Sequence, residues 1–154
     1  AALGYEFPAD ALVHALKFRG ELAPAGVLGE LLFEQIKSES VDCVMPVPLS
    51  AARLRSRGFN QSAEIARHLR ARLDLTACVR SRDTPAQMEL PYAERRRNVR
   101  GAFACTRSLA GERIALVDDV MTTGATLDEI AGVLKDAGAE RVENWVVART
   151  FAPD

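Results

Sequence analysis

Hydrophobic positions recur along this chain with two different spacings. Apolar residues repeat every three or four positions in four segments, which we predict to be helices: 9–18, 25–37, 60–73 and 127–137. Short apolar runs predict five buried strands: 41–47, 76–79, 102–105, 114–117 and 141–147. Because these strands alternate with amphipathic helices, the pattern predicts an α/β fold, a single domain with a mostly parallel sheet flanked by helices.

The remaining stretches complete this outline. Residues 53–59 are rich in arginine and predict a basic loop. Residues 80–100 are polar, contain two prolines and show no regular spacing of hydrophobic positions, so we predict a flexible loop. Loops of this length in compact domains are usually functional or mobile. Residues 1–37 form a helical N-terminal part. Gly138 follows the last predicted helix and is expected to close it in the left-handed conformation.

Composition is typical of one globular domain covering residues 1–154. Apolar residues make up 48% and charged residues 27% of the chain. The formal net charge of −1 provides no overall field for a polyanionic partner. No apolar run reaches the ~18 residues of a membrane span, and the first residues lack the pattern of a secretory signal. Cys43, Cys78 and Cys105 form no C-x-x-C pair, which predicts reduced thiols and a cytoplasmic protein.

The segment 114–127 carries the clearest chemistry. It reads as a strand, then two acids, then a short loop of hydroxyl residues and glycine, then the beginning of a helix. Ligands of open parallel sheets bind beyond the carboxyl ends of the strands, where this loop is expected. Backbone N–H groups and the helix dipole favour an anion there, and Gly124 allows a backbone conformation that a side chain would hinder. With the hydroxyls of Thr122, Thr123 and Thr126, the loop predicts a cradle for a phosphate monoester. It is not a Walker A loop, whose pattern the sequence lacks.

The adjacent acids, Asp118 and Asp119, require a ligand that donates hydrogen bonds. Ionised carboxylates only accept hydrogen bonds, and they would repel a phosphate unless they face donors or a cation. The two hydroxyls of a ribose are such donors, so the segment predicts a ribose 5-phosphate site. The alternative is a capped strand–helix turn with two solvated acids.

Residues 114–126 resemble the signature for 5-phosphoribosyl 1-pyrophosphate (PRPP) of type I phosphoribosyltransferases. That signature is four apolar residues, two acids, two apolar residues, Thr, a small residue, Gly, any residue and Thr, and the match is complete. Two further stretches, 44–61 and 84–103, are similar to the ComF subfamily, whose members are linked to competence for DNA uptake. The resemblance covers residues 5–150 and implies the type I phosphoribosyltransferase fold.

The resemblance also implies a role for each matching residue. Asp118 and Asp119 would hold the ribose hydroxyls as part of the catalytic site, together with Arg95, which would meet the pyrophosphate. The other assignments are the 5-phosphate cradle, Thr122, Thr123, Gly124, Ala125 and Thr126; the pyrophosphate loop, Leu49, Ser50, Ala51 and Arg53; and the flexible loop, Arg82, Gln87 and Arg100. Mg²⁺ would bridge pyrophosphate and ribose oxygens and keep several waters, so we expect no direct metal ligand set, with Asp118 as the one protein group that could contact it.

Two functions are compatible with these residues. The first is a Mg²⁺-dependent phosphoribosyltransferase that binds PRPP, transfers its phosphoribosyl group and releases pyrophosphate, serving DNA uptake. The acceptor of the phosphoribosyl group is unknown, and residues 1–37 could form a reduced hood, the segment that covers the acceptor. Thr122 stands where enzymes for 6-oxopurines usually have an Asp, which disfavours hypoxanthine–guanine salvage. The second is a non-catalytic module that binds a phosphoribosyl ligand or DNA-uptake proteins.

Other partners are less well supported by the sequence. Arginines are frequent in 53–57 and 95–100, yet the neutral net charge and the lack of interleaved aromatic residues argue against direct binding of nucleic acid. The sequence leaves the oligomeric state open, a homodimer included.

Overall fold

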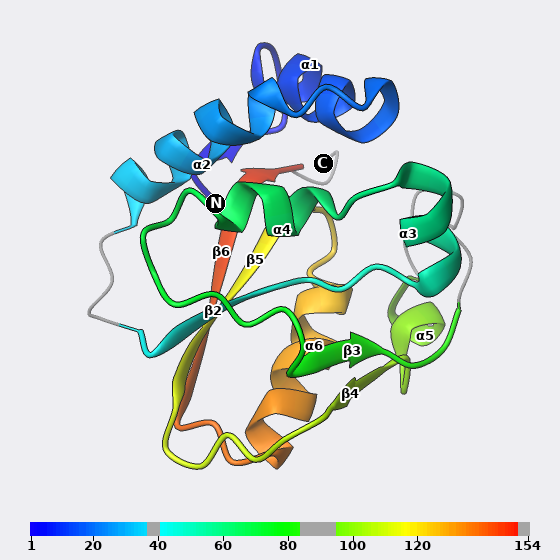
Figure 1. Ribbon diagram of the computed structural model, residues 1–154, viewed down its shortest axis with the longest axis vertical. Coiled ribbons are helices and arrows are strands. Elements are labelled where there is room, and N and C mark those ends of the chain that lie inside the picture. Colours follow the sequence, from blue (N-terminus) through cyan, green and yellow to red (C-terminus); the bar gives the residue numbers. More distant parts are fainter. Residues whose placement is uncertain (37–40, 84–94, 151–154) are drawn as a thin grey trace.

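The centre of the computed structural model, which describes residues 1–36, 41–83 and 95–150, is a four-stranded parallel sheet. Its strands lie in the order β1 (Leu3–Gly4), β6 (Arg141–Arg149), β5 (Arg113–Met121) and β2 (Cys43–Pro46) (Figure 1). β5 pairs in parallel with β2 on one side and with β6 on the other. The predicted parallel α/β architecture is therefore confirmed.

Helices cover both faces of this sheet (Figure 1). One face carries α1 (Ala9–His14), the π-helix η1 (Ala15–Arg19), α2 (Ala23–Gln35) and α4 (Gln61–Ala66), and the other carries α6 (Ala125–Asp136). Successive residues of a strand point to opposite faces. Accordingly, Ala115 and Val117 of β5 pack in the core under α2 and α4, whereas Ile114 and Leu116 pack in the core under α6. Both faces are apolar because both are covered.

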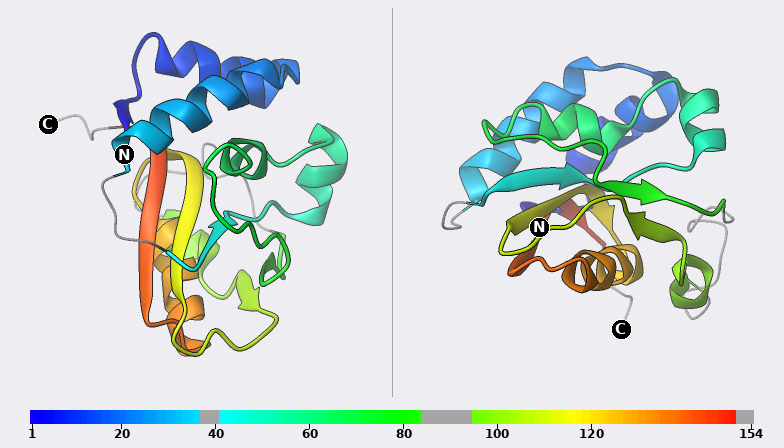
Figure 2. Two further views of the ribbon diagram at one scale, coloured as in Figure 1. Left: turned by 60° about the vertical axis from the view of Figure 1, so that its left-hand side comes forward. Right: turned by 60° about the horizontal axis from the view of Figure 1, so that its bottom comes forward.

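A second, smaller sheet lies beside α6 (Figure 2). It is an antiparallel pair of β3 (Cys78–Arg80) and β4 (Phe103–Cys105). The two predicted strands therefore pair with each other and not with the parallel sheet. Their buried residues, Cys78 and Phe103, extend the core that α6 covers.

The segment predicted as a basic loop is a helix instead. α3 (Ala51–Arg57) begins at Ser50, whose Oγ accepts a hydrogen bond from the N–H of Arg53 at 3.3 Å, and ends at Gly58, where φ is +85°. Ser is a favoured N-cap residue and Arg is a good helix former. The apolar period failed to indicate this helix because none of its residues is buried.

Other boundaries also differ from the sequence pattern. The helix predicted at 60–73 is only α4, because the chain turns at Arg70, which has a positive φ of +52°. The stretch 80–100 contains a short helix, α5 (Arg95–Val99), whose Val99 is buried. The strand predicted at 114–117 continues to Met121. The predicted cap at Gly138 is confirmed, with φ of +101°. Within the described ranges, no helix is both long and apolar enough to cross a membrane.

Candidate functional site

The two acids of the predicted site lie near the carboxyl end of β5, and their surroundings differ. Asp118 is partly exposed, whereas Asp119 is 2% exposed. Asp118 pairs with Val146 of the neighbouring strand, so both acids are held within the sheet and not on a loop beyond it. The rigid strand thus fixes the position of the carboxylates.

Asp118 is held by the beginning of α4. Its Oδ1 accepts hydrogen bonds from Ser62 Oγ at 3.1 Å and from the N–H of Asp119 at 2.9 Å. Ser62 itself is fully buried. Burial, and after it the negative charge of Asp119, raise the pKa of Asp118 to about 8. The site therefore holds a carboxyl group with a strongly shifted pKa, a feature that is frequent at functional sites.

Asp119 is held by the N-terminal helices. Lys17 Nζ of η1 lies 2.7 Å from Asp119 Oδ2, and the N–H of Val120 donates to Oδ1 at 2.7 Å. The sequence reasoning missed Lys17. A signal was available, because Lys17 lies four residues after Val13 and therefore falls on the apolar face of the predicted helix. A cation on such a face points to a buried partner.

The turn between β5 and α6 has the backbone that the sequence predicted. Gly124 adopts φ of +78° and directly precedes α6. The nearest atom to a Cβ placed there would be Met121 Sδ at 3.8 Å, so the conformation, and not crowding by the protein, requires glycine. Thr123 Oγ1 accepts a hydrogen bond from the N–H of Ala125 at 3.1 Å. Residues 122–126 thus gather at the N-terminus of α6, next to the acids, where the helix dipole favours an anion.

The predicted pyrophosphate loop lies at the end of β2 and the start of α3. Ser50 is 4% exposed and caps α3, Leu49 and Arg53 are partly buried, and Ala51 is exposed. The side chain of Asn60 ties this region to the sheet, since its Nδ2 donates to the carbonyl of Val47 at 3.0 Å. The loop is therefore anchored beside β5.

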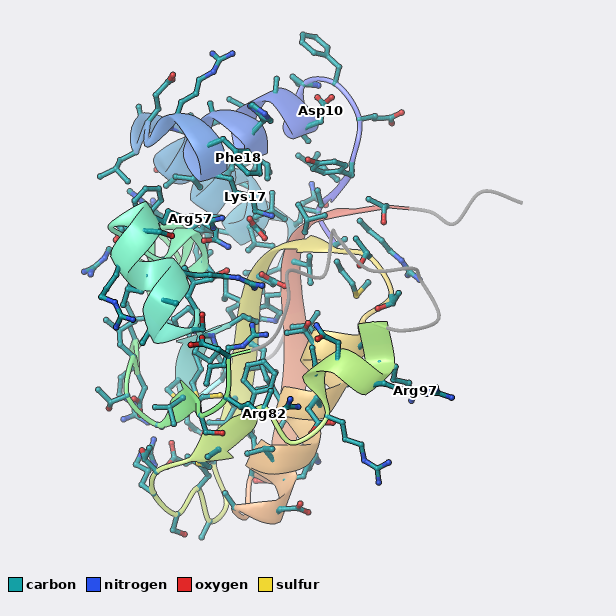
Figure 3. The ribbon with its side chains drawn as sticks, turned by 90° about the vertical axis from the view of Figure 1, so that its right-hand side faces the viewer. Asp10, Lys17, Phe18, Arg57, Arg82 and Arg97 are labelled. Carbon is teal, nitrogen blue, oxygen red and sulfur yellow. The ribbon has the colours of Figure 1, made fainter. Side chains whose placement is uncertain are left out.

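Three arginines gather near this loop, and the sequence analysis assigned only Arg53 to it. Arg57 Nη1 donates to Gln61 Oε1 at 2.6 Å. Burial lowers the pKa of Arg57, the charge of Asp119 raises it, and the charge of Arg53 lowers it further. Burial and Arg53 likewise lower the pKa of Arg80, whose guanidinium lies 5.3 Å from the ring centre of Phe103. Figure 3 shows Lys17 and Arg57 extending from separate helices toward the end of β5.

The predicted flexible loop is described only at its two ends. Arg82 Nη2 donates to the carbonyl of Arg100 at 2.7 Å, and the N–H of Gly101 donates to Glu129 Oε1 of α6 at 2.6 Å. These bonds close the base of the loop against α6. Arg95 begins α5. Gln87 lies outside the described residues, as does the rest of 84–94.

A hollow of about 260 Å³ lies elsewhere, on the amino-terminal half of β6. Ala2, Ile36 and Asn144 are among the residues that line it. It does not include the acids or the turn before α6, so the candidate site is the open carboxyl edge of the sheet and not this hollow.

Comparisons with known proteins show the family of this chain. A family model described as a phosphoribosyl transferase domain matches residues 32–152. DNA utilization protein YhgH of Escherichia coli K12 is 35% identical, over 96% of this chain and 70% of its own length. Competence protein F of Haemophilus influenzae is 31% identical, over 94% of this chain and 69% of its own length.

Solved structures give the same fold. An allosteric regulatory enzyme of purine biosynthesis matches 80% of this chain with a TM-score of 0.54 and 25% identity. A glutamine PRPP amidotransferase from B. subtilis matches with a TM-score of 0.53 and 22% identity. This chain spans about a quarter of each of these longer chains. The chain belongs to the phosphoribosyl transferase domain family, and its relatives in that family include DNA utilization protein YhgH and competence protein F.

Proposed function

We propose that this protein binds PRPP together with Mg²⁺ and transfers the 5-phosphoribosyl group to an acceptor with release of pyrophosphate, as part of DNA uptake or utilization. One observation carries the proposal. A pair of acids at the end of a central parallel strand is followed at once by a glycine with positive φ and a helix N-terminus. This order provides hydrogen-bond acceptors for a diol next to donors for a phosphate.

The 5-phosphate would bind at residues 122–126. The first N–H groups of a helix have no partners within the helix, and they point at a ligand placed beyond its N-terminus. Gly124 keeps the turn open, since Met121 is the only described residue, apart from the neighbours of Gly124 in the chain, that lies within 4 Å of a Cβ at this position. The hydroxyl of Thr123 still has a proton to donate while its oxygen accepts from Ala125.

The pyrophosphate would bind beside α3. Arg53, Arg57 and Arg80 concentrate positive charge near the end of β2, and each guanidinium can donate to phosphate oxygens in a bidentate manner. Departure of pyrophosphate from C1 leaves positive charge on the sugar and adds negative charge to the leaving group. Arginines placed where that negative charge develops would lower the barrier. The 80–100 loop would close over the site and exclude water.

The donors at the site fit Mg²⁺ if the ligand supplies most of its coordination. Asp118 presents a partly exposed carboxyl group, and the described residues contain no cluster of three or more acidic, His or Cys side chains that could enclose a metal. Mg²⁺ commonly binds through one or two carboxylates together with substrate phosphates and waters. When bound, it would neutralise charge on the pyrophosphate.

Calorimetric titration tests the proposal first. PRPP with Mg²⁺ should bind to the wild-type protein, and Asp118→Asn should weaken this binding while the protein remains folded. A screen of bases and amines for pyrophosphate release then tests transfer. Binding without release against any acceptor would favour the non-catalytic module, and absence of binding would overturn the proposal.

A further inference from the structure

The two acids of the site are used differently by the protein itself. Asp119 Oδ2 lies 2.7 Å from the ammonium of Lys17, and its Oδ1 accepts from the N–H of Val120. Oδ1 of Asp119 thus accepts a hydrogen bond, whereas the buried Oδ2 makes no hydrogen bond with the described residues and is balanced by the ion pair with Lys17. The residue is 2% exposed. Asp118 is partly exposed, and among the described residues its hydrogen bonds with Ser62 and the backbone involve Oδ1 alone. A ligand reaching the edge of the sheet therefore meets Asp118 first.

Lys17 reaches Asp119 from a distorted part of the N-terminal helices. η1 is a π-helix, a rare geometry that is frequent at functional sites. Its neighbour Leu16 is fully buried, and the Lys17 side chain is 15% exposed. The ammonium therefore sits between the apolar core under α1 and the carboxyl end of β5, as Figure 3 shows.

We infer that Lys17 is a positioning residue of the phosphoribosyl site. It balances the charge of Asp119, so that Asp118 is the acid that meets the ribose hydroxyls, and it joins α1 and η1 to the site. This inference rests on the proposed function. It divides between the two acids a role that the family resemblance assigned to both. It also gives residues 1–36 a defined connection to the ligand site, through the ion pair of Lys17 with Asp119.

Replacing Lys17, the largely buried partner of Asp119, tests whether it is a positioning residue. Lys17→Met leaves the carboxylate of Asp119 buried without its cation, and this disturbs the adjacent Asp118. PRPP affinity, measured calorimetrically with Mg²⁺, should fall about ten- to a hundredfold, the loss that corresponds to one charged hydrogen bond. Lys17→Arg should restore most of the affinity. The matched control is Arg19→Met, which removes a 67% exposed cation from the same π-helix and should leave affinity unchanged.

The double variant Lys17→Met/Asp119→Asn separates positioning from direct contact. If Asp119 only balances Lys17, replacing both by neutral groups removes the unpaired charge, and PRPP affinity should recover to near that of the wild type. If Asp119 itself holds a ribose hydroxyl, the double variant should bind as weakly as Lys17→Met or more weakly. That result, or a Lys17→Met variant whose folded protein binds normally, would overturn the inference.

Amide exchange without ligand keeps this test separate from the proposed function. Lys17→Met should increase exchange in residues 9–19, whereas Arg19→Met should not, because the ion pair with Asp119 is intact in the control. Wild-type protein that fails to bind PRPP would overturn the proposed function and with it the positioning role. Unchanged exchange in 9–19 would overturn the connection between η1 and the site whatever the ligand.

Discussion

Neutralising each acid of the site should change stability in opposite directions. Asp118→Asn removes a carboxyl group that folding places beside Asp119, whereas Asp119→Asn removes the partner of Lys17. Asn has nearly the same shape as Asp, so both substitutions conserve packing. Comparing these two isosteric changes therefore isolates the electrostatics of two neighbouring positions.

The magnitude for Asp118 follows from its shifted pKa. Folding raises this pKa from 3.8 to about 8. The folded protein therefore binds more protons than the unfolded chain between these values, and this contribution to stability declines as pH rises through that range. Each pH unit between the unfolded pKa of 3.8 and pH 7 adds ~1.4 kcal/mol to the free-energy cost of placing the Asp118 carboxyl group in the fold. At pH 7 this cost is therefore at most about 4 kcal/mol. Because Asp118 is partly exposed, we expect Asp118→Asn to stabilise the fold by about 1–3 kcal/mol at pH 7.

The magnitude for Asp119 follows from its burial. Removing one partner of a buried ion pair usually costs about 3–5 kcal/mol. Lys17 is 15% exposed and can regain some hydration, so Asp119→Asn should destabilise by about 2–3 kcal/mol. The effects of the two substitutions should not add, because the residues are adjacent.

Urea denaturation at several pH values provides the assay. The single tryptophan, Trp145 on β6, is partly buried and reports unfolding by its fluorescence. The advantage of Asp118→Asn over wild type should be small near pH 4 and should increase toward pH 8. A constant difference across this range, or destabilisation by Asp118→Asn, would refute the reasoning.

Three further measurements test other parts of the structure. Gly124→Ala should cost about 1–2 kcal/mol, because its φ of +78° is left-handed, and it should weaken binding of inorganic phosphate in a titration; retained stability would contradict the backbone argument. A thiol reagent should modify Cys105 first, because burial raises the pKa of Cys43 to about 11 and that of Cys78 to about 12; equal rates for all three would contradict it. Burial opposes ionisation of Asp74, yet hydrogen bonds from the backbone and from Arg107 lower its pKa to about 2, so Asp74→Asn should destabilise the fold by about 2 kcal/mol at pH 7. This loss of stability should shrink as pH falls from about 4 toward 2, and a loss that stays constant would contradict the assignment.

The sequence by itself was enough to predict the parallel α/β fold and the turn of the site. Both depend on local patterns. Strands buried on two faces have uninterrupted apolar runs, and the turn after β5 needs glycine because of its own φ. Residues 122–126 are contiguous, so their gathering at one helix N-terminus required no knowledge of distant contacts.

Only the tertiary structure showed which residues surround the acids. Lys17 precedes Asp119 by about a hundred positions, and Ser62 reaches Asp118 from a different helix. The local hydrophobic pattern does not predict that η1 and α4 cover the same end of β5. The helix at 51–57 was missed for a related reason: it buries no residue and so has no apolar stripe. The hydrophobic pattern of a sequence indicates which residues are buried. The pairing of charged residues depends instead on which elements the fold brings together, and this tertiary arrangement gives Asp118 and Asp119 their different environments.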